Sequence, residues 1–78
     1  MKTSEYWAGH EYVREHARSK TESRCLIRLV EVLATQWNED YFKNSPFAVR
    51  LNGEDFGTFA TLEEARECFD NVEKIYND

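Results

Sequence analysis

The chain has 78 residues, 41% of them hydrophobic and 32% charged, which is material for one hydrophobic core, and we expect a single domain over residues 1–78. Its formal charge is −5, and three Gly and one Pro are too few for a collagen-like or low-complexity chain. Because no apolar run approaches the roughly 18 residues of a membrane span and no apolar leader follows the start, we expect a soluble, cytoplasmic protein.

The first predicted element is a helix from Ser4 to about Lys20. Ser4 can cap free amides, and Glu5 places a carboxylate in the positive first turn. The residues that then share one helical face are Tyr6, His10, Val13 and Ala17. Two packings of this helix are open: it completes the core, or it exposes an apolar surface that serves as a contact site. The residues of that surface are Tyr6, Trp7, Tyr12 and Val13.

A second helix is predicted after a break at residues 21–23, and it ends near residues 38–40. Its apolar positions recur at helical spacing and are Leu26, Leu29, Val30, Leu33 and Trp37. A strand competes with this interpretation, because four residues of the segment are β-branched: Ile27, Val30, Val32 and Thr35. Length favours the helix, since the pattern runs for over three turns and strands usually stop at about six residues. We expect this helix to be the central, most buried one.

The next segment alternates as a β-hairpin does, and its inward residues are Phe47, Val49 and Leu51. Asn52-Gly53 suits the positive φ angles of a type I′ turn. A strict two-residue loop would pair Val49 with Phe56 and leave Phe59 on the opposite face. A longer loop or a bulge near Gly57 would bring Phe59 round to the core. The sequence therefore predicts the hairpin and leaves its register open.

The last predicted element is a helix over residues 61–76. It begins with a capping box in which the Thr61 hydroxyl can accept from the third amide while the Glu64 carboxylate reaches back. Its apolar face consists of Leu62, Ala65, Phe69, Val72 and Tyr76, with Cys68 and Ile75 alongside. An isolated hairpin is marginal in water, so we expect this helix to cover it. The hairpin residues beneath the helix are Phe47, Val49, Leu51 and Phe56.

These elements give an α+β fold class: two N-terminal helices, a β-hairpin and a C-terminal helix, packed as one small domain. Tyr41 and Phe42 either finish the second helix or open a third short strand.

Cysteine and histidine positions give no metal or disulfide framework. Cys25 and Cys68 both lie in apolar helical patterns, where a free thiol behaves as a small hydrophobe. His10 and His16 are six residues apart, which does not match the three- or four-residue step that places two ligands on one helix face. We expect neither a metal nor another cofactor.

Enzyme motifs are also missing from the sequence. The three glycines, at positions 9, 53 and 57, fit no phosphate-binding spacing, and no Gly-x-Ser-x-Gly elbow occurs. The adjacent carboxylates Glu63 and Glu64 diverge by about 100° on a helix, so they do not face each other as acid and base. We therefore expect a protein that is not an enzyme.

Charge is distributed unevenly along the chain. Residues 1–39 carry six basic and six acidic side chains, whereas residues 40–78 carry four basic and nine acidic ones. A negative field repels nucleic-acid phosphates and attracts basic protein surfaces. The one basic cluster lies around the junction of the first two predicted helices, where Arg14 with Arg18 and Arg24 with Arg28 are four apart and would share helix faces.

A local resemblance appears between residues 50 and 65. The motifs are the Asn-Gly turn, a Gly57-x-Phe59 exit and a Thr61-x-x-Glu64-Ala65 helix start. They resemble the hairpin-plus-helix module of integrase-arm and ethylene-response-factor-type DNA-binding domains, over about 30 residues, and also small phage-encoded accessory proteins. The resemblance implies a hairpin packed on a helix and DNA binding through the sheet. Those modules present basic and aromatic side chains, whereas this turn carries Glu54 and Asp55.

These observations favour a non-catalytic protein-binding module, a small phage or mobile-element inhibitor of the anti-CRISPR kind, which docks an acidic face on a basic partner protein. The expected partner-binding residues are Glu54, Asp55, Glu63, Glu67, Asp70, Trp7 and Tyr12. The alternative is a small nucleic-acid-binding regulator that uses the hairpin together with Arg14, Arg18, Arg24 and Arg28. A homodimer joined through the first helix is a third hypothesis, and no membrane partner is expected.

Overall fold

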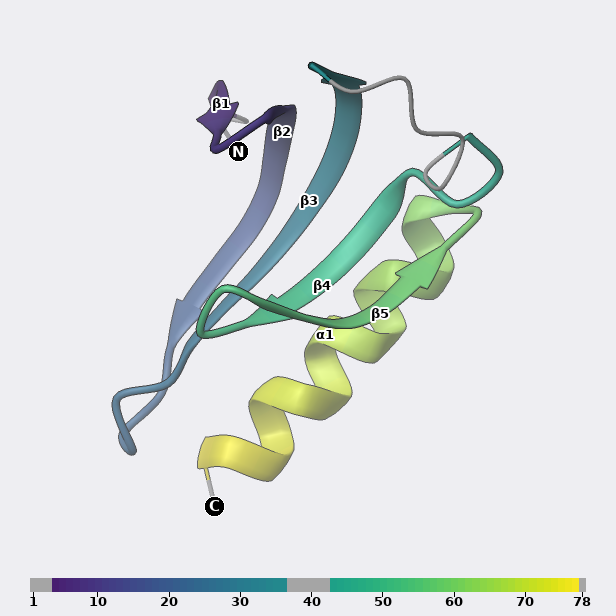
Figure 1. Cartoon of the computed structure of the whole chain (residues 1–78). Coiled ribbons are helices and arrows are strands. Elements are labelled where there is room, and N and C mark those ends of the chain that lie inside the picture. The colour runs from purple at the N-terminus through teal and green to yellow at the C-terminus, as the bar shows by residue number, and fades with distance from the viewer. Residues whose placement is uncertain (1–3, 37–42, 78) are drawn as a thin grey trace.

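The computed structural model describes residues 4–36 and 43–77, and it shows a twisted antiparallel sheet with one helix on one face (Figure 1). The elements are β1 (Ser4–Ala8), β2 (Glu11–Lys20), β3 (Leu26–Thr35), β4 (Phe47–Leu51), β5 (Glu54–Phe59) and α1 (Leu62–Asn77). The five strands lie in the sheet in chain order, each antiparallel to the next. The fold is thus mostly β, and the α+β class with two N-terminal helices is wrong.

Residues 4–20, predicted as the first helix, form the hairpin of β1 and β2. The chain reverses at Gly9-His10, where Gly9 has a φ of 66° and Ala8 pairs with Glu11. Glycine adopts this left-handed conformation without a steric penalty, which explains its place at the turn. Gly9 therefore lies in the turn between β1 and β2, whereas the sequence interpretation placed it inside a helix.

Residues 26–35, predicted as the central helix, form β3 in the middle of the sheet. The strand is buried on both faces: Ile27 and Leu29 pack toward α1, while Val30 and Val32 pack on the opposite side. A strand covered on both faces carries apolar residues at odd and even positions, so the alternation that marks a half-exposed strand is lost. The β-branched residues of this segment correctly indicated a strand.

Two irregularities interrupt the pairing of β2 with β3. The register shifts between Tyr12 and Val13 and again between Glu15 and Ala17. As a result Val13 lies in the cluster opposite α1, whereas Ala17 packs on the α1 side. In a regular strand residues four apart share a face, so the second bulge separates two residues that the helical pattern had grouped.

The β4–β5 hairpin confirms the prediction made for residues 47–59. Asn52 and Gly53 have φ angles of 54° and 89°, as a type I′ turn requires, and Leu51 pairs with Glu54. A register shift follows, because Arg50 pairs with Asp55 but Val49 pairs with Gly57. The bulge leaves Phe56 unpaired and returns Phe59 to the core side, opposite Phe47, which is the second of the two registers considered.

Helix α1 begins where the capping box placed it. The Glu64 amide donates to Thr61 Oγ1 at 3.2 Å, and the Thr61 hydroxyl donates to Glu64 Oε1 at 3.0 Å. The helix packs on β3, β4 and β5. The buried core between them consists of Ile27, Leu29, Val49, Ala65, Phe69 and Val72. Phe56, which was expected beneath the helix, is 53% exposed instead.

The other face of the sheet has a second cluster of buried residues, Val13, Val30, Val32 and Ala48, with Tyr6 and Ala8 packed against it. Beside it Arg50 donates to Glu11 and to Asp55, each at 2.7 Å. The predicted end of the second helix near residues 38–40, together with Trp37, Tyr41 and Phe42, lies outside the described residues.

Candidate functional site

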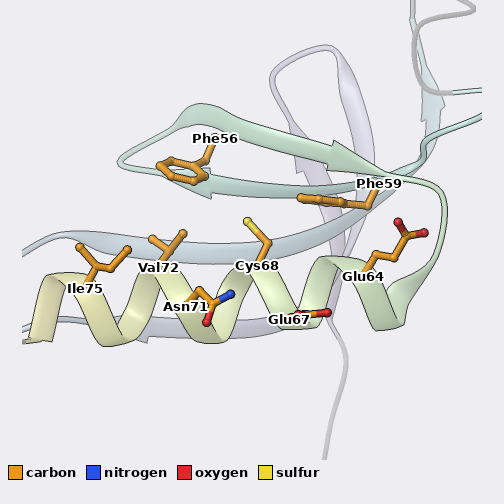
Figure 2. Close-up of a pocket in the computed structure, with 8 residues that line it drawn as sticks. All are labelled: Phe56, Phe59, Glu64, Glu67, Cys68, Asn71, Val72 and Ile75. Carbon is orange, nitrogen blue, oxygen red and sulfur yellow. The ribbon is translucent and has the colours of Figure 1, made fainter.

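A groove of about 400 Å³ lies between strand β5 and helix α1 (Figure 2). Its lining residues are Phe56, Phe59, Glu64, Glu67, Cys68, Asn71, Val72 and Ile75. We call it the β5–α1 groove. Figure 2 shows the two phenylalanines on the β5 side and the other six side chains along α1. Its middle is apolar, whereas its rim on the helix is polar and acidic.

The β5 wall depends on the bulge. Because Phe56 is the extra residue between the Asp55 and Gly57 pairs, its side chain leaves the core and lies over the groove. Gly57 makes room for the second ring, since a Cβ atom built at Gly57 would come within 3.2 Å of Phe59 Cζ. The glycine thus allows the Phe59 ring to lie against the strand.

The α1 wall is formed by a second stripe of side chains beside the core-facing one. Cys68, Asn71 and Ile75 recur at steps of three and four residues, so they lie along one side of the helix. Ile75 is 64% exposed, and it lies near Phe56, which is 53% exposed. Large apolar side chains that remain in water next to a groove are typical of a contact surface.

Carboxylates border the groove on the helix side. Glu64 and Glu67 line it, and Glu63, Glu67 and Asp70 form an exposed stripe on the outer surface of α1, which we call the acidic stripe. Among the described residues, no ion pair compensates the three carboxylates of this stripe. Helix α1 carries more acidic residues than basic ones, which are Arg66 and Lys74, so a net negative field extends into solvent, as the sequence-predicted site requires.

The thiol of Cys68 is part of the groove wall. Partial burial raises the pKa of this thiol, because the charged thiolate loses solvation there. Cys68 is consequently protonated at neutral pH and contributes a polarizable apolar surface to the groove. Cys25 and Cys68 are both free thiols in this structure.

The predicted acidic residues at the hairpin turn have different surroundings. Glu54 is exposed beside the turn. Asp55 accepts a hydrogen bond from Arg50 Nε at 2.7 Å, so its charge is compensated within the chain. Of the predicted acidic set, the three helix residues thus lie together, and Asp55 has a structural role.

Trp7 and Tyr12 are adjacent to each other but belong to the β1–β2 hairpin, at the opposite edge of the sheet from β5. Their ring centroids are 5.4 Å apart, and the planes are tilted by 56°. The Tyr12 hydroxyl donates to Glu5 at 3.3 Å. The fold therefore does not bring these aromatic residues to the β5–α1 groove.

The arginines proposed for nucleic acid do not share helix faces, because the two helices do not exist. Arg14 forms ion pairs with Glu5 at 2.9 Å and with Glu31 at 3.6 Å. Arg18 bonds Glu15 at 3.0 Å, and this hydrogen bond raises the pKa of its guanidinium.

The two remaining arginines lie apart from each other. Arg28 donates to the Tyr6 hydroxyl at 3.2 Å, on the sheet. Arg24 lies in the turn between β2 and β3 with a φ of 64°. Of the four arginines, Arg14, Arg18 and Arg28 thus have side-chain hydrogen bonds within the chain, and two of these three are bonded to carboxylates.

Sequence reasoning missed the apolar part of the groove. It placed Phe56 in the core, left the face of Phe59 open, and treated Cys68 and Ile75 as neighbours of the main helical stripe. The signal that could have found the groove is the pair of Cys68 and Ile75, seven residues apart and outside the core stripe, combined with the bulge option for Phe59.

No helix in the described part of the chain has both the length and the apolarity needed to cross a bilayer. Comparison with models of protein families, with curated proteins and with solved structures finds no match to this chain.

Proposed function

We propose that this chain is a non-catalytic protein-binding module, which docks the β5–α1 groove and the acidic stripe onto a basic surface of a partner protein. One observation carries the proposal: an apolar groove with exposed phenylalanine and isoleucine side chains lies directly beside carboxylates that have no ion pair within the described residues. Apolar area removed from water supplies affinity, and the carboxylates supply orientation and a faster encounter.

The mechanism of such a module is steric. A partner's basic surface that is covered by α1 and β5 cannot reach its own ligand, and the negative charge of the acidic stripe also repels acidic ligands from that surface. No bond-making step is needed for this action.

The nucleic-acid-binding alternative was based on pairs of arginines that share helix faces, and this region forms strands instead. Arg14 and Arg18 are bonded to carboxylates of the same chain, so little positive field is left for phosphate. The protein-binding function is therefore the one that the charges of the described residues support.

The experiment is selection from a library of random twelve-residue peptides displayed on phage, with the purified chain immobilised. We expect enriched peptides to combine Lys or Arg with large apolar residues. Counter-selection uses the Glu63→Lys/Glu67→Lys variant, which should not retain the enriched peptides, whereas Glu22→Lys, which changes the charge at the β2–β3 turn, should retain them. Enrichment of acidic peptides, or no enrichment, would refute the proposed function.

A further inference from the structure

Strand β5 is an outer strand of the sheet. It pairs with β4 on one side, and the described residues include no strand on its other side. Every second residue of such an edge directs its amide and carbonyl groups outward, where they can pair with another chain. Edges are commonly protected by charged residues, Pro or a bulge, and in β5 the carboxylates Glu54 and Asp55 and the bulge at Phe56 protect only the first half of the strand. Its regular part runs from Gly57 to Phe59, after the bulge.

The β5–α1 groove opens beside this edge, on the side of the sheet that α1 covers. A strand added next to β5 would direct alternate side chains toward α1, into the groove. The groove has two different ends: Val72 and Ile75 lie near Phe56, whereas Glu64 and Glu67 lie toward Phe59 (Figure 2). An apolar side chain suits the first end, and a basic one suits the second.

Spacing links these two ends to one strand. Residues two apart on a strand are about 7 Å apart and point to the same face. Glu67 and Val72, five residues apart on α1, are separated along the helix axis by about 7.5 Å. Along the helix axis, this separation matches positions i and i+2 of one strand, with a basic side chain at the level of Glu67 and an apolar one at the level of Val72.

We propose that the occupant of the groove is an extended segment of the partner protein that adds to β5 as a sixth strand, with Lys or Arg two residues from a large apolar residue. This inference rests on the proposed function and specifies how the partner binds. Main-chain hydrogen bonds to β5 give affinity, and the groove selects the alternate side chains. A second copy of this chain that paired through its own β5 is a poor occupant, because that strand carries Glu54 and Asp55 and no basic residue to meet Glu64 and Glu67.

The test uses two synthetic peptides of identical composition. The first, acetyl-Thr-Lys-Thr-Leu-Thr-Lys-Thr-amide, places Leu and both Lys on one strand face and serves either strand direction. The second, acetyl-Thr-Lys-Leu-Thr-Thr-Lys-Thr-amide, moves Leu to the other face. Each peptide is titrated into the protein, and the amide signals of the protein are monitored by NMR. The first peptide should cause saturable shifts at Gly57 and Thr58. The second should bind about tenfold more weakly, because its Leu cannot enter the groove.

Backbone pairing is tested by N-methylation of the first peptide. Methylating the Lys and Leu amides blocks one edge of the added strand, and methylating the Thr amides blocks the other. Strand addition predicts that one of these peptides loses binding and the other keeps it. Loss in both, or retention in both, would overturn the inference.

Matched variants locate the site. Phe56→Ala/Ile75→Ala should weaken binding of the first peptide about tenfold. Leu33→Ala, which also removes an exposed apolar side chain but from β3, should leave it unchanged. Bound peptide should also slow iodoacetamide modification of Cys68, which lines the groove.

Failure of this inference can be told from failure of the proposed function. Equal affinity of the two peptides, or no binding of either, rules out strand addition. The phage selection does not require the peptide to bind as a strand. If the selected peptides are basic and apolar and do not bind the Glu63→Lys/Glu67→Lys variant, the proposed function stands in both cases.

Discussion

Arg50 forms ion pairs with Glu11 and Asp55 on the face of the sheet opposite α1, and only 8% of its surface is exposed. Burial by itself lowers the pKa of this guanidinium, but the hydrogen bonds to Asp55 and Glu11 and the charges of those carboxylates outweigh burial and raise it. Each partner is stable in this position because the other is present, since a buried charge without a counter-ion is strongly unfavourable.

Replacement of Arg50 by Met keeps much of the side-chain volume and removes the charge. Glu11, 7% exposed, then loses its ion-pair partner, and we expect the free energy of unfolding to fall by about 3 kcal/mol. Urea denaturation measures the change. Glu11→Leu/Arg50→Met should recover part of the loss, because it buries no charge at either position. A double variant that is less stable than Arg50→Met alone would show that the ion pair is not the cause.

Cys68 makes the stability of the protein depend on pH in the alkaline range. The pKa of its thiol is higher in the folded chain than in the unfolded chain, so the unfolded chain releases the proton first as the pH rises. Its contribution is complete at neutral pH and is lost above about pH 8.5. Between pH 7 and about pH 9.5 the wild type should lose more free energy of unfolding than Cys68→Ala, with Cys25→Ala as the matched control. Equal losses for wild type and Cys68→Ala would contradict this assignment.

At the scale of elements, Gly9 distinguishes the β1–β2 hairpin from the helix that the sequence suggested. In a helix Gly9→Ala would stabilise the chain by about 1 kcal/mol. At a turn residue with a φ of 66°, the same change should cost about 1 kcal/mol, although no atom obstructs the new Cβ. Thermal or urea denaturation of Gly9→Ala gives the sign, and a gain in stability would contradict the hairpin.

The elements that were predicted correctly have strong local signals. The capping box at Thr61 and the Asn52-Gly53 turn each specify a backbone conformation within four residues, and both occur as expected. The prediction for β3 failed because its secondary structure depends on the elements that cover it. Helix α1 packs on one face, and Val13 of the β1–β2 hairpin lies in the cluster on the other. That information is tertiary, and helical spacing can arise from it by coincidence.

The candidate site was predictable in its charge and not in its shape. The exposed positions of Glu63, Glu67 and Asp70 follow from the phase of helix α1. The groove beside them follows from the bulge at Phe56, and a bulge depends on the pairing of β4 with β5 rather than on either strand alone.

At the scale of the whole molecule, charge and exposed apolar surface coincide at one place. Arg14 and Arg18 are compensated by carboxylates of the β1–β3 region, whereas the acidic stripe has no ion pair among the described residues. The β5–α1 groove lies next to that stripe. Binding of a basic partner at this place should therefore be accelerated by long-range attraction and should depend on salt.

The most direct measurement is the association rate constant of a phage-selected peptide, determined by stopped-flow fluorescence at low and at physiological salt. For the wild type we expect fast association that slows with salt, and for Glu63→Lys/Glu67→Lys a rate about tenfold lower with little salt dependence. Glu22→Lys should stay close to the wild type. Equal rates and equal salt dependence for the wild type and the double variant would contradict binding through the acidic surface of α1.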